Sequence, residues 1–212
     1  VWADVVASDL LRGMVAEVQH CAELIVQIVH LTSVHPREDV RIFHKECRTL
    51  AKAGYDVSLV VADGKGDEMR DGVSIIDVGR TEGGRWKRMT ATRGRVLRQA
   101  LELDADIYHF HDPELLPAGL TLRGKGKRVI YDAHETFPAT FKTKPYIPWP
   151  LHFLGAWGFG SYEMYVAKRL SGVVAATPAI ANRLRQVQPR TEVVANFPMM
   201  DEIDSNTGAW EI

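Results

Sequence analysis

The segment Asp106-Ile-Tyr-His-Phe-His-Asp-Pro-Glu-Leu-Leu116 is the part of the chain that decides the fold. Its apolar start predicts a buried strand over Ile107–Phe110, and the proline that follows is typical of the first turn of a helix. The strand carries His109, His111 and Asp112 to its carboxyl end. In an open parallel sheet, ligands bind beyond the carboxyl ends of the strands. The segment therefore predicts a polar site at that edge.

A second segment, Arg128-Val-Ile-Tyr-Asp-Ala-His-Glu135, repeats the pattern. It predicts a strand that ends in Asp132, His134 and Glu135. Residues two apart on a strand face the same way, so Asp132 and His134 share a face, as the two histidines of the first segment do. Two neighbouring strands that both end in histidine and carboxylate strengthen the prediction of one polar site.

Apolar runs of strand length alternate with amphipathic helical segments along the chain. Strands are predicted at 25–31, 57–61, 73–78, 107–110, 129–132, 173–176 and 191–195, and helices at 40–53, 89–103, 113–122, 161–170 and 178–186. This alternation predicts an α/β fold with a doubly wound, mostly parallel, Rossmann-like sheet of about seven strands.

The first strand and the helix after it carry two further signals. The loop 32–39 contains no glycine, whereas a dinucleotide-binding fold needs glycines there so that the backbone can approach a pyrophosphate. This counts against bound NAD or FAD. In the helix, the apolar spacing predicts that Phe43 and Cys47 face inward and that Arg41 and Lys45 lie on other faces.

The predicted domain organisation has three parts. Residues 1–24 form an extra amphipathic N-terminal helix, 25–198 the Rossmann-like domain, and 199–212 an acidic linker or tail. Within the domain, residues 136–160 are rich in aromatic residues and proline, with two lysines. Two interpretations of them stay open: aromatic packing on the domain, or an interfacial surface.

Composition excludes several classes of function. The net charge is −1 at pH 7, which argues against bulk electrostatic binding of nucleic acid. The two cysteines, Cys21 and Cys47, form neither a disulfide framework nor a zinc spacing, so a reducing, cytosolic setting is the default expectation. No apolar run approaches the roughly 20 residues that a membrane span needs.

Three chemistries fit the predicted polar edge. Histidine donors and carboxylate acceptors suit binding of a sugar or a phosphate. A His-x-His pair with an aspartate also resembles the ligand sets of metal-dependent hydrolases. The third interpretation is structural, with a buried histidine paired to an aspartate beneath the loops. Residue types alone leave all three open.

A set of motifs, in order, resembles a known family. They are Ile28-Val-His-Leu-Thr-Ser-Val-His-Pro36, Asp39-Val-Arg-Ile42, Lys45, Ala53-Gly-Tyr-Asp-Val57, the two segments described above, Ala167-Lys-Arg-Leu-Ser-Gly-Val-Val-Ala-Ala-Thr177 and Val193-Val-Ala-Asn-Phe-Pro198. Together they resemble the N-terminal, acceptor-side domain of family 4 glycosyltransferases, which are retaining enzymes of the GT-B fold. The resemblance spans about residues 26–198.

The resemblance implies a two-domain enzyme that uses a nucleotide-sugar donor and a glycan or lipid-linked acceptor in polysaccharide or glycolipid synthesis. The C-terminal domain of the family binds the donor nucleotide, and the reaction needs no metal or other cofactor. His111 is expected to touch the donor sugar at the reacting centre. The residues expected to bind acceptor or donor are Arg37, Asp39, Arg41, His109, Asp112, His134 and Glu135.

Further expectations follow from where the sequence stops. It ends shortly after Asn196-Phe-Pro198, where the family crosses into its donor domain, so we expect the chain alone to transfer no sugar. The missing donor domain or subunit is an expected partner, and residues 137–159 are an expected peripheral contact with the inner face of the membrane. A stand-alone glycan- or lipid-carrier-binding module and a hydrolase with a metal on His109, His111, Asp112 and His134 are the alternatives.

Overall fold

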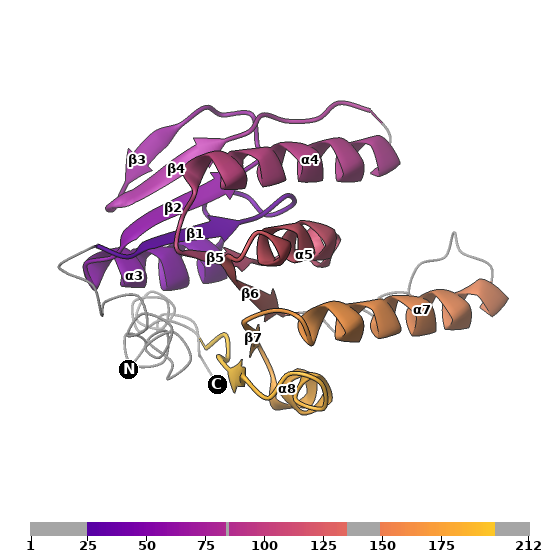
Figure 1. The fold of residues 1–212 in the computed structure, drawn as a ribbon. Coiled ribbons are helices and arrows are strands. Elements are labelled where there is room, and N and C mark those ends of the chain that lie inside the picture. Colours follow the sequence, from indigo (N-terminus) through magenta and orange to yellow (C-terminus); the bar gives the residue numbers. More distant parts are fainter. Residues whose placement is uncertain (1–24, 84, 135–148, 198–212) are drawn as a thin grey trace, which may run out of the picture.

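A computed structural model of the chain describes residues 25–83, 85–134 and 149–197 (Figure 1). Its strands are β1 (Gln27–Leu31), β2 (Asp56–Val61), β3 (Glu68–Arg70), β4 (Val73–Asp77), β5 (Ile107–Phe110), β6 (Arg128–Ala133), β7 (Gly172–Ala175) and β8 (Thr191–Val193). They form one sheet in the order β3-β4-β2-β1-β5-β6-β7-β8. Every neighbouring pair is parallel except β3 and β4. The predicted fold class is confirmed.

Helices cover both faces of this sheet. They are η1 (Val40–Cys47), α3 (Arg48–Lys52), α4 (Arg85–Leu103), η2 (Pro113–Leu115), α5 (Leu116–Gly124), α7 (Trp149–Ala167) and α8 (Pro178–Leu184). Side chains of α4, α5, α7 and α8 share one core with one face of the strands, including Tyr108 and Tyr131. Within the described residues, η1 and α3 cover the opposite face, where Phe43, Cys47 and Ile107 belong to a second core.

The site forms where the chain changes direction across the sheet. From β1 the chain moves outward through β2 to β4, and α4 then returns it to β5, on the other side of β1. The carboxyl ends of β1 and β5 therefore lie side by side, with connections that leave toward different regions. Such a switch point is where open α/β sheets bind ligands.

Several boundaries differ from the sequence-based prediction. All seven predicted strands are present, and the short antiparallel strand β3 is an eighth. The helix predicted at 161–170 begins at Trp149 instead, because Pro150 occupies its first turn, where proline is tolerated. Thr177 caps α8, since its Oγ1 accepts a hydrogen bond from the amide of Ile180. The predictions for residues 1–24 and 199–212 lie outside the described residues.

The prediction for the faces of the helix at 40–53 was partly wrong. Its first eight residues form the π-helix η1, in which Arg41 and Lys45 are buried beside Phe43 and Cys47. A π-turn closes bonds between residues five apart, and here the His44 amide donates to the carbonyl of Asp39 over 3.3 Å. Residues five apart therefore come onto one face. This winding turns charged side chains toward the sheet.

Two helical glycines test the packing on the face of the sheet that α4 and α5 cover. A Cβ on Gly119 of α5 would lie 2.7 Å from Cε1 of the Phe110 ring, whereas a Cβ on Gly94 of α4 would meet nothing within 4 Å. We expect Gly119→Ala to lower the free energy of unfolding by about 1–3 kcal/mol, because the clash outweighs the gain in helix propensity. Gly94→Ala should raise it by up to about 1 kcal/mol. Urea unfolding of both variants measures the difference, and equal effects would contradict the packing described here.

Candidate functional site

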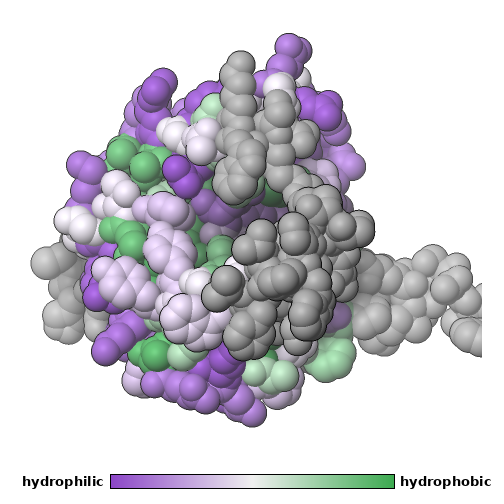
Figure 2. Space-filling view, turned by 90° about the vertical axis from the view of Figure 1, so that its right-hand side faces the viewer, coloured by the Kyte–Doolittle hydropathy of each residue, from purple (hydrophilic) through white to green (hydrophobic). Residues whose placement is uncertain are grey.

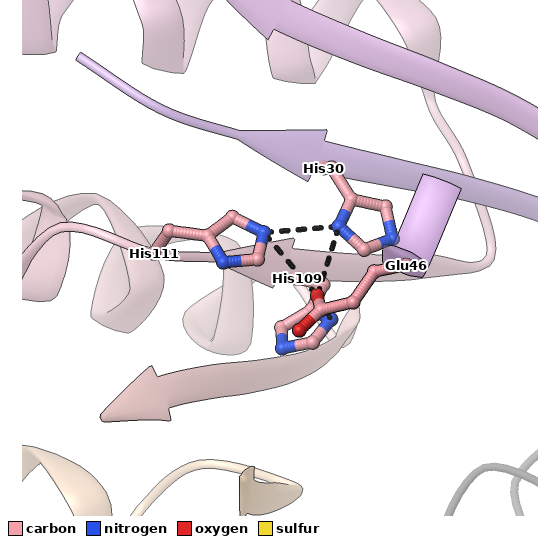
Figure 3. Close-up of side chains that lie close together, drawn as sticks. All are labelled: His30, Glu46, His109 and His111. Carbon is pink, nitrogen blue, oxygen red and sulfur yellow. Dashed lines mark hydrogen bonds and ion pairs between the residues drawn. The ribbon is translucent and has the colours of Figure 1, made fainter. Parts of the chain in front are cut away.

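A buried cluster of four side chains lies between the sheet and η1 (Figure 3). His30 of β1 is paired in register with His109 of β5, and His111 follows two residues later on the same face. Glu46 reaches the three rings from η1. All four residues are buried, and each histidine ring centroid lies within 5.2 Å of the other two. We call His30, Glu46, His109 and His111 the histidine cluster.

A chain of hydrogen bonds connects the cluster to a buried ion pair. Arg41 donates through Nε and Nη2 to the two carboxylate oxygens of Asp132, over 2.7 and 2.8 Å. Asp132 Oδ2 also lies 3.0 Å from His111 Nδ1, and His111 Nε2 lies 2.9 Å from His30 Nδ1. An arginine-bound carboxylate is an acceptor, so His111 carries its proton on Nδ1 and receives one at Nε2 from His30. This fixes the tautomer of His111.

Glu46 divides its two oxygens between two environments. Oε1 lies 3.3 Å from Arg41 Nε. Oε2 lies 3.8, 3.7 and 3.9 Å from the nearest nitrogens of His30, His109 and His111. Neither oxygen has a hydrogen-bond partner within the described part of the chain. Burial, together with the charge of Asp132, raises the pKa of Glu46 well above its usual value.

Burial also keeps the three rings of the cluster neutral. It lowers the pKa of His30 well below 6.5, and it lowers that of His109 to about 3. The pKa of His111 is lowered too, because burial outweighs the attraction of Asp132. For Asp132 the balance is the reverse: burial opposes ionisation, but Arg41 and the His111 hydrogen bond hold its pKa well below the usual value. The cluster therefore combines neutral imidazoles with one fixed ion pair.

A second, more open group of side chains lies beside the cluster. The rings of His35 and His134 approach to 3.3 Å between their Nε2 atoms, and these side chains are 28% and 18% exposed. His35 also faces Asp39 at 3.2 Å and Asp112 at 3.3 Å. Although burial lowers the pKa of His134, the nearby Asp132 carboxylate raises it overall. We call His35, Asp39, Asp112 and His134 the open group, because it includes the side chains a ligand could reach.

Asp112 is held rigidly at the end of β5. Its Oδ2 accepts hydrogen bonds from Thr32 Oγ1 at 2.8 Å and from the amide and hydroxyl of Ser33 at 2.5 and 3.0 Å. The Ser33 hydroxyl also lies 2.6 Å from Glu114 Oε1. The loop after β1 is thus fastened to the strand end of β5, which keeps the open group in place.

Arg37 and Asp39 have structural partners. The guanidinium of Arg37 donates to Asp63 over 2.7 and 2.6 Å and to the carbonyl of Gly66, and it pairs with Glu68 at 3.1 Å. Asp39 caps η1 by accepting from the amides of Arg41 and Ile42. Although partial burial opposes ionisation, the hydrogen bonds from His35 and these amides lower the pKa of Asp39 to about 2. Arg37 therefore connects the loop after β1 to residues 63–68.

The structure brings most of the predicted residues together, but in two layers. Arg41, His109 and His111 lie in the buried layer, and Asp39, Asp112 and His134 lie in the open group. Arg37 is paired with Asp63 and Glu68 instead, and Glu135 is outside the described residues. The prediction that His111 touches the donor sugar stays a prediction; its ring has no exposed surface here.

Three residues of the site were not predicted from the sequence: His30, Glu46 and His35. His30 and His35 lay within the motif at 28–36, but nothing local in the sequence shows that His30 pairs with a residue 79 positions later. Glu46 was not predicted to face the sheet because the prediction assumed the period of an α-helix, which the π-helix η1 does not follow.

Two sets of side chains in the described residues could hold a metal ion. One is the histidine cluster, and the other comprises His111, Asp132 and His134. Asp112 belongs to neither. The four residues of the hydrolase alternative therefore do not converge as one ligand set.

A comparison with the sequence profiles of known families identifies one match. The sequence profile of Glycosyltransferase Family 4 matches residues 40–197. No curated protein matches in sequence.

Solved structures of GT-B glycosyltransferases share the fold at low identity. Sucrose-phosphate synthase from Thermosynechococcus elongatus is 13% identical to this chain, with a TM-score of 0.62. The match covers 83% of this chain and 49% of the synthase chain. An E. coli trehalose-phosphate synthase bound with UDP-2-fluoro glucose is 12% identical with a TM-score of 0.56, covering 86% and 51%. Os79 from O. sativa, in complex with UDP, is 12% identical with a TM-score of 0.54, covering 81% and 51%. The chain thus spans about half the length of these enzymes.

The neutral histidines predict a specific dependence of stability on pH. The unfolded chain binds protons at histidine below about pH 6.5, whereas His30, His109 and His111 stay neutral when folded, so stability should fall as the pH drops from 6.5 to 5. Glu46 opposes this, because its raised pKa favours the folded state at low pH. The raised pKa of His134 acts in the same sense as that of Glu46, but three buried histidines outweigh these two groups, so stability should rise with pH between 5 and 6.5.

His109→Gln removes one of these protons, and the mean slope between pH 5 and 6.5 should fall by about 1.1 kcal/mol per pH unit, because an unfolded histidine is only half protonated at pH 6.5. Urea unfolding in the presence of a chelator measures it, so that no divalent ion occupies the cluster. His44→Gln, on η1 but outside the cluster, is the control and should keep the wild-type slope. An unchanged slope in His109→Gln would show that His109 is not held neutral.

Proposed function

The chain belongs to glycosyltransferase family 4, and we propose that it is the acceptor-side half of a retaining transferase. In this proposal, a nucleotide-sugar donor binds to a second domain or subunit, and a glycan or lipid-linked acceptor binds to this half. The product belongs to polysaccharide or glycolipid synthesis at the cell envelope, on the cytoplasmic side. The observation that carries the proposal is the polar site at the β1/β5 switch point of a family 4 domain.

The two layers of the site suggest a division of labour. His35 and His134 have exposed surface and can meet a sugar hydroxyl or a phosphate oxygen. The buried Arg41–Asp132 pair sits behind them and orients His111 and, at 3.6 Å, His134. We propose that His134 contacts substrate directly. His111 acts on the donor sugar only if its ring becomes exposed in the substrate-bound state.

A two-domain reaction explains why this half should be inactive alone. Groups split between two domains supply catalysis only when both are held in one geometry. The half-length match to GT-B enzymes supports the expectation that the donor nucleotide binds elsewhere.

The aromatic segment at 137–159 is the basis for a second part of the proposal, a peripheral membrane contact. Its described portion lies in α7, where Trp157 is 68% exposed; residues 137–148 lie outside the described residues. On the face toward which α7 points, apolar residues are interspersed with hydrophilic ones (Figure 2). No described helix is long and apolar enough to cross a bilayer.

Flotation with anionic liposomes should recover the wild type but less of Trp157→Ser, and equal recovery would contradict this contact.

Nucleotide release tests the transferase proposal. The assay compares the 212-residue chain with a two-domain protein in which it is joined to its donor-binding half, on a panel of UDP- and GDP-sugars. We expect release only by the two-domain protein. In that protein, His134→Ala should lower the rate at least about 10-fold, the loss of one good hydrogen bond in the transition state.

His44→Gln is the matched control and should keep the rate, because His44 bonds to Arg48 away from the site. Turnover by the isolated chain would overturn the two-domain proposal. A wild-type rate in His134→Ala would overturn the role of His134.

A further inference from the structure

The histidine cluster is held together by few hydrogen bonds of its own. Among its four side chains there is one hydrogen bond, between His30 and His111. Four of its buried polar atoms have no hydrogen-bond partner in the described residues: His30 Nε2, His109 Nε2 and both oxygens of Glu46. Buried polar groups without partners cost roughly 1–3 kcal/mol each, so the Glu46 carboxylate, whose Oε2 faces the three rings, calls for a missing partner.

The charges around the cluster identify what that partner would be. Arg41 and Asp132 offset each other in their ion pair, and the three imidazoles are neutral. An ionised Glu46 would therefore add a buried negative charge with only a shared contact to Arg41 at 3.3 Å. A cation bound by His30 Nδ1, His109 Nδ1, His111 Nε2 and Glu46 Oε2 would compensate this charge, and His30 would then carry its proton on Nε2 instead of donating it from Nδ1 to His111. Imidazole nitrogens with one carboxylate suit zinc and related divalent ions.

The spacing of the nitrogen and oxygen atoms agrees with such an ion. Ligand atoms of a tetrahedral zinc lie about 3.3–3.4 Å apart, since its bonds are about 2.0–2.1 Å long. In the cluster, His30 Nδ1 lies 2.9 Å from His111 Nε2, and Glu46 Oε2 lies 3.7–3.9 Å from the nitrogens of the three rings (Figure 3). One atom from each side chain can be chosen so that all four lie within 4.8 Å. Binding of an ion would draw the most widely separated of these atoms together, from at most 4.8 Å to about 3.4 Å.

The surroundings of the cluster also have the form of a metal site. A ligating histidine usually donates its other ring N–H to a carboxylate, which fixes the tautomer and raises the basicity of the ligand nitrogen. His111 does so, because its Nδ1 faces Asp132 at 3.0 Å while its Nε2 faces the cluster. Asp132 is in turn fixed by Arg41 through two hydrogen bonds. Glu46 is oriented by Arg41 on one oxygen and offers the other.

We propose that His30, His109, His111 and Glu46 bind one divalent transition-metal ion of the zinc type. The four protein ligands leave no open position, which is the pattern of a structural rather than a catalytic zinc. The ion would join β1, β5 and η1, three elements that lie far apart in the sequence. It fastens η1 to the strand ends beneath the open group. This inference does not depend on the proposed transferase activity.

Metal binding by the purified 212-residue chain tests the proposal. After removal of metals with a chelator, the chain is loaded with Zn²⁺, passed through gel filtration and analysed by mass spectrometry of the metal. We expect one zinc per chain and a higher melting temperature in Zn²⁺ than in chelator. Zinc absorption-edge spectroscopy of the wild type should show a shell of nitrogen and oxygen with about three imidazoles, a result that needs no variant.

Two variants and a control assign the site. Glu46→Gln and His109→Gln should each weaken zinc binding by at least about 10-fold, and His44→Gln should bind as the wild type does. Circular dichroism of the metal-free proteins verifies that they are folded. Less than stoichiometric zinc on the wild type, a shell without imidazoles, or equal affinity in Glu46→Gln would overturn the proposal.

Discussion

The buried ion pair between Arg41 and Asp132 is the interaction on which the site depends. It joins η1 to the end of β6, and Arg41 Nη1 also donates to the carbonyl of Val194, beyond β8. Removing one partner of such a pair typically costs about 3–5 kcal/mol, because it leaves the other charge buried and uncompensated. The pair sets the tautomer of His111 and the charge next to His134. The Asp132 carboxylate therefore contacts both the buried His111 and the partly exposed His134.

The π-helix is what allows this arrangement. In an α-helix, residues five apart would point in different directions, whereas η1 turns both Arg41 and Glu46 toward the sheet. Asp39 caps η1 and also contacts His35, so the start of the helix and the open group are one unit. Lys45 of η1 reaches Asn196 and the carbonyl of Phe197 over 2.7 Å, which connects the helix to the end of the described chain.

Sequence alone predicted the alternation of strands and helices, the edge of the sheet and the shared faces of His109 with His111 and of Asp132 with His134. These follow from local periods and from the rules of parallel sheets. It could not predict that His30 lies opposite His109, because register between distant strands is a property of the assembled sheet. The α-helical period also misplaced Arg41 and left out Glu46. The helix predicted from residue 161 begins at Trp149 in the structure, since the first turn of α7 accommodates Pro150.

The most direct measurement of this account is hydrogen exchange on Asp132→Asn compared with the wild type. If the Arg41–Asp132 pair holds η1 against the sheet, the amides of 42–47 should exchange much faster in the variant. Those of α4, which packs on the opposite face, should keep their protection. Unchanged protection of η1 in a folded Asp132→Asn would show that apolar packing of Ile42, Phe43 and Cys47 suffices, and that the ion pair does not hold the site together.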